Sequence, residues 1–252
     1  MALPGTTLTE VEDWLGDLRR LTMLNLSDNR LTALPEQVGE LRALTHLQLD
    51  RNQLKQLPDA LTTLPSLTTL DVSRNKLTAL PDQLGNLTTL TEFTPANNRL
   101  TALPESLGNL TALTTLDVSR NRLATLPESI GDLEHLYLLE AANNRLTELP
   151  DSIGRLTRLG RLILTNNHLT HLPATITDLS ALSMLYLSDN HLTALPPAMS
   201  GLTHLTWLFA DDNQLTEVPP DLRNLHLTRL DLRGNAIRHH PDWLAAIDHC
   251  AL

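Results

Sequence analysis

The sequence is poor in aromatic residues, in cysteine and in long apolar runs. Aromatic side chains make up 3% of the 252 residues, so they supply little of any buried core. The single cysteine, Cys250, excludes an internal disulfide framework. No apolar run approaches the ~20 residues that a membrane-spanning helix needs. The first residues lack the basic and apolar segments of a signal peptide, so we expect a cytoplasmic protein that does not enter a membrane.

Cations are also scarce, since 19 Lys and Arg residues stand against 29 Asp and Glu and leave a net charge of -10. Nonspecific nucleic-acid binding needs an excess of cations, so a nucleic-acid partner is not expected. The positions of His, Cys, Asp and Glu match no recognised metal-ligand spacing, and no phosphate-binding loop is present. We therefore expect neither a metal nor a cofactor.

Leucine, by contrast, supplies about a quarter of the chain, and asparagine recurs with a fixed period. Around each asparagine the pattern reads L-x-x-L-x-L-x-x-N-x-L-x-x-L-P, and ten such units fill residues 21–241. A register held over this many copies indicates a repeat architecture. The asparagines are 23 residues apart, with a last interval of 22: Asn29, Asn52, Asn75, Asn98, Asn121, Asn144, Asn167, Asn190, Asn213 and Asn235.

The pattern resembles the leucine-rich repeats, specifically their 23-residue intracellular type, in which L-P-[DE]-x-[LI]-G-x-L follows the strand. Ras-group-related leucine-rich-repeat scaffolds and the repeat arms of Roco GTPases are of this type. The resemblance implies a protein-binding scaffold, and it implies a small GTPase or another signalling protein as the kind of partner.

The spacing itself favours the same fold. The L-x-L step has a period of two, so one strand face points inward and the residues between point outward. Each unit has one apolar side that only its neighbours can bury. We predict a single right-handed α/β solenoid, with a parallel sheet on the concave face and short helices or turns on the convex face. Residues 1–20 and 242–252 are predicted to form helical caps, with the apolar residues of 8–18 on one helical face.

Two features bear on the regularity of this stack. The asparagines are expected to be structural, because an amide can satisfy backbone groups that a turn leaves unpaired. Pro95 replaces an inward apolar residue of the fourth repeat and removes a backbone donor from a central strand. We therefore predict a bulge or a local bend at this repeat.

Function is sought at the two outward strand positions of each repeat, which form columns because neighbouring strands are ~4.8 Å apart. In repeats 6–9 these columns hold three of the seven aromatic residues of the chain. Exposed apolar clusters usually mark binding sites, and Trp and Tyr are enriched at interface hot spots. We predict that a protein partner binds there; the alternatives are a second copy of the chain and a permanent cover. The cluster, called here the apolar patch, consists of Leu138, Ile163, Met184, Tyr186, Trp207 and Phe209.

Charged residues border the patch. Asp189, Asp211 and Asp212 flank one side, and Glu140 with Arg161 flanks the other. Such a rim fits a partner with an apolar anchor and a positive charge. A basic column also runs just past the asparagines, and it is either a solvated edge or a site for an anionic group. It contains Arg99, Arg122, Arg145, His168 and His191, with Arg74 and Arg120 nearby.

An enzyme or small-molecule binder on the same face is the alternative function. Asp117 and Glu140 are expected on adjacent strands, where paired carboxylates can act as acid and base, with Tyr186 close by. A wide concave face excludes water poorly, whereas catalytic sites are usually enclosed. Ion pairs of Glu140 with Arg161 and of Asp117 with Arg120 would account for the carboxylates without catalysis.

Overall fold

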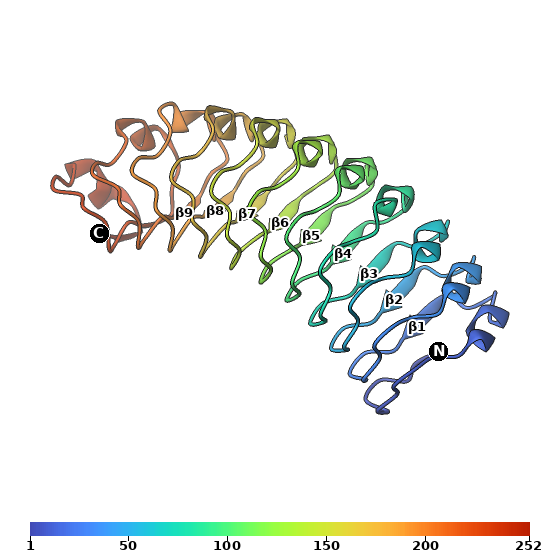
Figure 1. The fold of residues 1–252 in the computed structure, drawn as a ribbon. Helices are drawn as coiled ribbons and strands as arrows, with labels where there is room; N and C mark the ends of the chain where they lie inside the picture. Colours follow the sequence, from blue (N-terminus) through green and yellow to red (C-terminus); the bar gives the residue numbers. More distant parts are fainter.

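The computed structural model describes all 252 residues and contains eleven strands in one parallel sheet. The strands pair in chain order from β1 to β11. Figure 1 shows them side by side along the inner side of an arc, with short helices along its outer curve. This is the predicted solenoid, and each of its turns is called a rung and numbered by its strand.

Each strand is three residues long, and equivalent residues of successive repeats are register partners, as Leu24 is with Leu47. Because the repeat length is nearly constant, every rung adds to the last one without a slip in register. The strands are β1 (Met23–Asn25), β2 (His46–Gln48), β3 (Thr69–Asp71), β4 (Glu92–Thr94), β5 (Thr115–Asp117), β6 (Leu138–Glu140), β7 (Arg161–Ile163), β8 (Met184–Tyr186), β9 (Trp207–Phe209), β10 (Arg229–Asp231) and β11 (His249–Ala251).

The convex side of each rung carries a short 3-10 helix. Val38 N–H, for example, donates to the Pro35 carbonyl at 3.1 Å, which is the i to i+3 bond of this helix type. In η2 the Glu36 carboxylate accepts the N–H of Ala60 from the next rung at 3.2 Å, so a first-turn acid links two rungs. None of the helices has the length and apolarity to cross a membrane. They are η1 (Asp13–Asp17), η2 (Glu36–Glu40), η3 (Asp59–Thr63), η4 (Leu84–Asn86), η5 (Glu105–Asn109), η6 (Glu128–Asp132), η7 (Asp151–Arg155), η8 (Ala174–Asp178), η9 (Met199–Gly201), η10 (Pro220–Asn224) and η11 (Asp242–Ala246).

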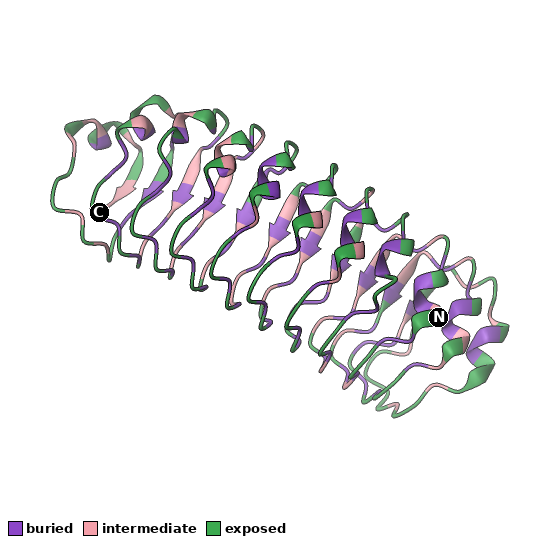
Figure 2. Ribbon diagram, turned by 45° about the horizontal axis from the view of Figure 1, so that its top comes forward, coloured by how far each residue is buried: buried purple, intermediate pink, exposed green.

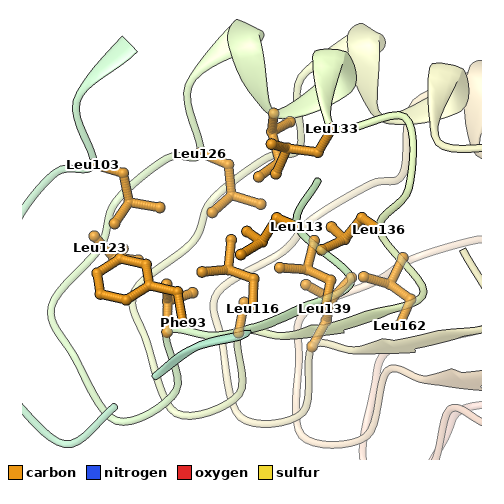
Figure 3. Packing of buried hydrophobic residues seen from close by; sticks show 14 of the residues in the cluster. Phe93, Leu103, Leu113, Leu116, Leu123, Leu126, Leu133, Leu136, Leu139 and Leu162 are labelled. Atoms are coloured by element: carbon orange, nitrogen blue, oxygen red, sulfur yellow. The ribbon is translucent and has the colours of Figure 1, made fainter. Parts of the chain in front are cut away.

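A continuous core of mainly leucine side chains fills the space between sheet and helices. The middle residue of each strand from β1 to β9 is buried, while its neighbours are more exposed (Figure 2). Phe93 takes this inward position in β4, has 0% of its surface exposed and lies among Leu103, Leu116 and Leu123 (Figure 3). Leucine thus replaces the aromatic residues that the composition lacks.

The asparagines form the predicted ladder, and Asn121 shows the pattern. Its Nδ2 group donates to the carbonyls of Pro95 and Val118 at 3.0 Å, and its Oδ1 atom accepts Leu100 N–H at 3.0 Å. The side chain is 9% exposed. Each asparagine therefore satisfies buried backbone groups of its own rung and of the rung before it, which makes the column structural.

The amino-terminal end differs from the expected helix over residues 8–18. Only η1 is helical, and the segment before it runs beside the first rung. Leu3 N–H donates to the Asn25 carbonyl at 2.8 Å, and Arg30 N–H donates to the Leu8 carbonyl at 2.7 Å. The backbone groups at the edge of β1 need partners, and this segment supplies some of them.

The carboxy-terminal segment also departs from a purely helical cap. It contains η11, in which Leu244 is buried, but it continues into β11, which pairs with β10. Trp243 and Ile247 are half-buried against the last part of the core. Pairing with the edge of β10 satisfies backbone groups that a helix would leave exposed.

Pro95 does not produce the predicted bulge. Strand β4 stays in register with both neighbours, since Glu92 pairs with Thr69 and with Thr115. The β4–β5 pairing spans two residues where β3–β4 spans three. At the equivalent position Val118 N–H donates to the Glu140 carbonyl at 2.8 Å, a bond that proline cannot make. The rung loses a hydrogen bond but contains no extra residue, so the strand is not displaced.

Candidate functional site

The structure brings the six residues of the apolar patch together on the concave face. They are the first and third residues of adjacent strands, where side chains flank the buried middle leucine. In the first column Arg161 pairs with Leu138 and with Met184, which in turn pairs with Trp207. In the second column Ile163, Tyr186 and Phe209 follow one another on β7, β8 and β9.

The patch is less exposed than its position predicts, because its members cover one another. All six side chains are half-buried. The rings of Tyr186 and Phe209 stack with their centres 5.0 Å apart, and Trp207 meets Phe209 edge-on at 6.4 Å. The Arg229 guanidinium lies over the Trp207 ring, 4.3 Å from its centre. These contacts hold the rings against one another, and each ring stays partly exposed on the concave face.

Tyr137 is an exposed aromatic residue directly before β6, and it lies outside the two columns that the sequence pattern predicts. The residue before each strand is usually threonine, whose hydroxyl donates to the preceding rung, as Thr114 Oγ1 does to the Thr91 carbonyl at 3.0 Å. Tyr137 breaks this column and is 50% exposed. The next rung has Gly160, where an added Cβ would overlap the tyrosine ring. The signal was a tyrosine followed one repeat later by a glycine in a threonine column.

The charged residues at the rim of the patch differ in whether their side chains already have a partner within the protein. Asp189 and Asp212 are exposed, with φ values of 54° and 51° in the left-handed region that Asp tolerates. Asp211 is engaged, because its Oδ1 atom accepts the Ser188 hydroxyl at 2.5 Å. Arg161 is exposed and forms no ion pair. Asp189, Asp212 and Arg161 are therefore free to contact a partner.

The carboxylates of the catalytic alternative are neighbours, but they do not form the expected ion pairs. Asp117 and Glu140 are register partners on β5 and β6. Burial raises the pKa of the Glu140 carboxyl, and the charge of Asp117 raises it further. Arg161 lies opposite Leu138 and not opposite Glu140, which leaves Glu140 without a cation, and Arg120 forms no ion pair with Asp117.

Tyr186 does not join these carboxylates in an enclosed pocket. A hollow of about 400 Å³ is lined in part by Asp117, but neither Glu140 nor Tyr186 lines it. The Tyr186 hydroxyl instead lies 3.9 Å from the sulfur of Met184. The Asp117 carboxylate accepts the N–H of Ser119 at 2.9 Å, which is a local turn contact. The geometry therefore assembles no acid, base and substrate pocket from these three residues.

The raised pKa of Glu140 makes a testable difference to stability. A carboxyl group whose pKa is higher in the folded state costs stability where it is charged, and the cost disappears as pH falls through that raised pKa. Glu140→Gln should therefore stabilise the protein at neutral pH by up to about 0.5 kcal/mol, a small value because the group is half exposed and screened. The gain should vanish near pH 4 in urea unfolding measurements.

Glu92→Gln provides the control, since Glu92 is an exposed carboxylate in the other column of the same face. It should leave the free energy of unfolding unchanged within error. A Glu140→Gln protein that is less stable than the wild type at neutral pH would contradict the burial argument.

A second hollow adjoins the patch beyond Phe209, between β9 and β11. Its volume is about 460 Å³, and its lining includes Phe209, Arg229, Asp231 and Cys250. Arg233 donates to the Asp231 carboxylate at 2.5 Å, and this contact lowers the pKa of Asp231. Burial raises the pKa of the Cys250 thiol, with a further contribution from Asp231, so the thiol stays neutral. The hollow can take an apolar side chain beside the Phe209 ring.

The basic column predicted beside the asparagines is present at the carboxyl ends of the strands. Arg99, Arg122 and Arg145 are exposed and form no ion pair. The rings of His168 and His191 continue the column and are stacked, with centres 5.6 Å apart and planes 4° from parallel.

Comparison with known families assigns the chain. A leucine-rich-repeat family model matches residues 3–54, 19–77, 42–100 and 157–215, a model of a leucine-rich-repeat region matches 94–166, and a third repeat model matches 223–238. The protein therefore belongs to the leucine-rich-repeat family. A comparison with curated protein sequences gives no match.

Solved structures of repeat proteins resemble the whole arc. A leucine-rich-repeat protein of Leptospira interrogans is 31% identical with a TM-score of 0.89, and the match covers 100% of this chain and 71% of that one. The ectodomain of the Arabidopsis thaliana receptor kinase GASSHO1/SCHENGEN3, solved with Casparian strip integrity factor 2, is 31% identical with a TM-score of 0.86 and coverages of 96% and 31%. The ectodomain of the Arabidopsis receptor kinase HAESA, solved with an IDA peptide hormone, is 32% identical with a TM-score of 0.79 and coverages of 93% and 42%. The chain thus spans less than half of each receptor chain.

Proposed function

We propose that this protein binds a protein or peptide partner on its concave face and that the apolar patch of rungs 6–9 anchors that partner. The single observation that carries the proposal is the aromatic platform formed by Tyr186, Trp207 and Phe209 on two adjacent rungs. A strand face needs no aromatic residue at these outward positions, because the middle leucines already complete the core.

The platform is suited to binding because its rings are held before a ligand arrives. Stacking and the Arg229 contact restrict the rings, so little side-chain entropy is lost on binding. Tyr137 and the hollow beside Phe209 add apolar contact area at the two ends of the patch. Asp189 and Asp212 add unpaired charge at its rim, which favours a partner that carries a cation next to its apolar anchor.

Related repeat proteins support a protein or peptide as the kind of partner. The two Arabidopsis receptor ectodomains were solved with a peptide hormone and with a factor bound, and both match this chain above 30% identity. The resemblance to Ras-group-related repeat scaffolds adds small GTPases as the first folded candidates. We propose a cytoplasmic location because a single cysteine leaves no disulfide framework of the kind found in many secreted repeat proteins.

The experiment selects ligands from a displayed library of random linear peptides of about 15 residues, which extended cover the ~48 Å of ten rungs. The wild-type protein is the selection target, and every selected peptide is then tested for binding to a Tyr186→Ala, Trp207→Ala, Phe209→Ala triple variant. Circular dichroism first establishes that the variant is folded. A control triple variant carries His46→Ala, Gln48→Ala and Thr69→Ala, at outward strand positions of β2 and β3.

Peptides that bind the wild type and the control but not the triple variant support the proposal. Peptides that depend on the control positions, or that bind all three proteins alike, contradict it. Sizing of the wild type and the triple variant at several concentrations separates self-association: a dimer lost only in the variant would assign the patch to a second copy of the chain.

A further inference from the structure

Six cations gather on one edge of the solenoid although the protein carries a net charge of -10. They flank the asparagine ladder at the carboxyl ends of β3–β6, on four adjacent rungs. None of the six forms an ion pair, and Lys76 donates only to the neutral Gln53 Oε1 atom at 2.9 Å. This set, called here the basic ridge, consists of Arg74, Lys76, Arg99, Arg120, Arg122 and Arg145.

The ridge contains a notch at the fourth rung. The rungs on either side carry a serine followed by an arginine, whereas the fourth carries Ala96 and Asn97. The shorter side chains leave the hollow of about 400 Å³ whose walls include Arg74 and Arg120. These two arginines are two rungs apart, or ~9.6 Å, so that both guanidinium groups can reach an anion placed between them.

The acid nearest to this notch does not neutralise it. Asp117 lines the hollow, but it forms no ion pair with Arg120, and its Oδ1 atom accepts the N–H of Ser119 at 2.9 Å. Like charges on neighbouring rungs repel one another, and a ligand of opposite charge removes that cost. The structure thus leaves a set of donors without acceptors along the edge.

We infer that the basic ridge binds an acidic segment, a short run of Asp and Glu residues, of the same partner that inserts its apolar anchor into the patch. This inference rests on the proposed function and adds the chemistry of the partner and its placement along the sheet. Four rungs span ~14 Å, which four or five residues of an extended chain cover.

A protein segment suits the ridge better than a nucleic acid because the positive edge is short. Beyond the sixth rung the equivalent edge position carries the neutral Asn166 and then Asp189 and Asp212, which are exposed. A long uniform polyanion that follows the edge would meet this negative charge and be repelled. A peptide that is acidic at one end, and apolar with a cation at the other end, matches both the basic ridge and the apolar patch with its acidic rim.

The positions of ridge and patch also give a spacing. The middle of the ridge lies between rungs 4 and 5, and the stacked rings of Tyr186 and Phe209 lie on rungs 8 and 9. Four rung spacings correspond to ~19 Å, or about six residues of an extended chain. Peptides that bind through the patch should therefore carry acidic residues centred about six positions from their aromatic or apolar anchor.

The test uses the peptides selected through the patch and a charge-reversal variant of the ridge, Arg99→Glu, Arg122→Glu and Arg145→Glu. The matched control, Arg20→Glu, Arg158→Glu and Arg223→Glu, changes the net charge equally at exposed arginines outside the ridge that form no ion pair. Titration calorimetry at low and high salt measures each affinity.

We expect the selected peptides to show the acidic run and to bind the ridge variant about tenfold or more weakly than the control. Salt should weaken binding to the wild type more than binding to the ridge variant. Patch-dependent peptides without acidic residues, or with equal affinity for both charge variants, would overturn the inference and leave the proposed function standing. An absence of patch-dependent peptides would contradict both the inference and the proposed function.

An oligonucleotide of about ten nucleotides serves as a further probe. Ridge-dependent binding to it in place of the acidic peptides would assign the ridge to nucleic acid.

Discussion

Asn121→Ala should destabilise the protein by about 2–4 kcal/mol, because it removes three hydrogen bonds from the middle of the ladder. The substitution leaves the buried Leu100 N–H without a partner, which costs about 1–3 kcal/mol. The carbonyls of Pro95 and Val118 each lose one of two asparagine donors and keep the other, so each adds about 0.5 kcal/mol. Urea unfolding followed by circular dichroism measures the loss.

Asn109→Ala is the control for this prediction. Asn109 is exposed at the end of η5, and its loss should change the free energy of unfolding by less than about 0.5 kcal/mol. Similar unfolding midpoints for the two variants would show that the ladder contributes little, and they would contradict the structural role of the asparagines.

Removal of the aromatic platform should abolish most binding without unfolding the protein. The Tyr186→Ala, Trp207→Ala, Phe209→Ala variant should bind peptides selected on the wild-type protein roughly 100-fold or more weakly, since hot-spot aromatics each contribute about 2 kcal/mol or more. The rings lie on the outer side of a core that the middle leucines complete, so the fold should persist.

Calorimetric affinities and unfolding curves are needed together for this variant. The control with His46→Ala, Gln48→Ala and Thr69→Ala should keep wild-type affinity, because those residues lie on the same two columns but outside the patch. A triple variant that is folded and binds within about threefold of the wild type would contradict the anchor role of the patch.

Most of the fold could be predicted from the sequence because one pattern is repeated in register. The L-x-L steps place Leu47, Leu70 and Leu116 inward, and the structure buries all of them. The asparagine period predicts the ladder, and the ladder's hydrogen bonds confirm it. A repeated pattern averages out local ambiguity, since an error in one copy is corrected by the others.

The ends of the chain were harder to predict because they lack neighbours that repeat. The strand β11 over His249–Ala251 has none of the leucines of the motif, and it forms because the edge of β10 offers unpaired backbone groups. Pro95 had the opposite outcome: its missing donor predicted a bulge, but the fixed repeat length on both sides kept β4 in register.

The sequence could place the six patch residues on one face, but it could predict neither Tyr137 nor the contacts among the side chains. The period-two pattern placed the patch residues on one face, yet it could not show that Tyr186 and Phe209 stack or that Arg229 covers Trp207. The predicted ion pairs were wrong for the same reason. Glu140 and Arg161 lie in successive repeats, but they occupy different columns, so their charged groups do not form an ion pair.

The central claim is that a partner lies across the patch on the concave face, and site-specific photo-cross-linking tests it most directly. A photoreactive benzoylphenylalanine replaces Tyr186 in one protein, Gln48 on β2 in a second and Arg158 outside the concave face in a third. Each protein is irradiated with a peptide selected from the library, and the yield of the covalent complex is measured by mass spectrometry. We expect the strongest cross-link from position 186, a weaker one from position 48 and none above background from position 158. Efficient cross-linking from position 48 or 158, with position 186 silent, would contradict the central claim.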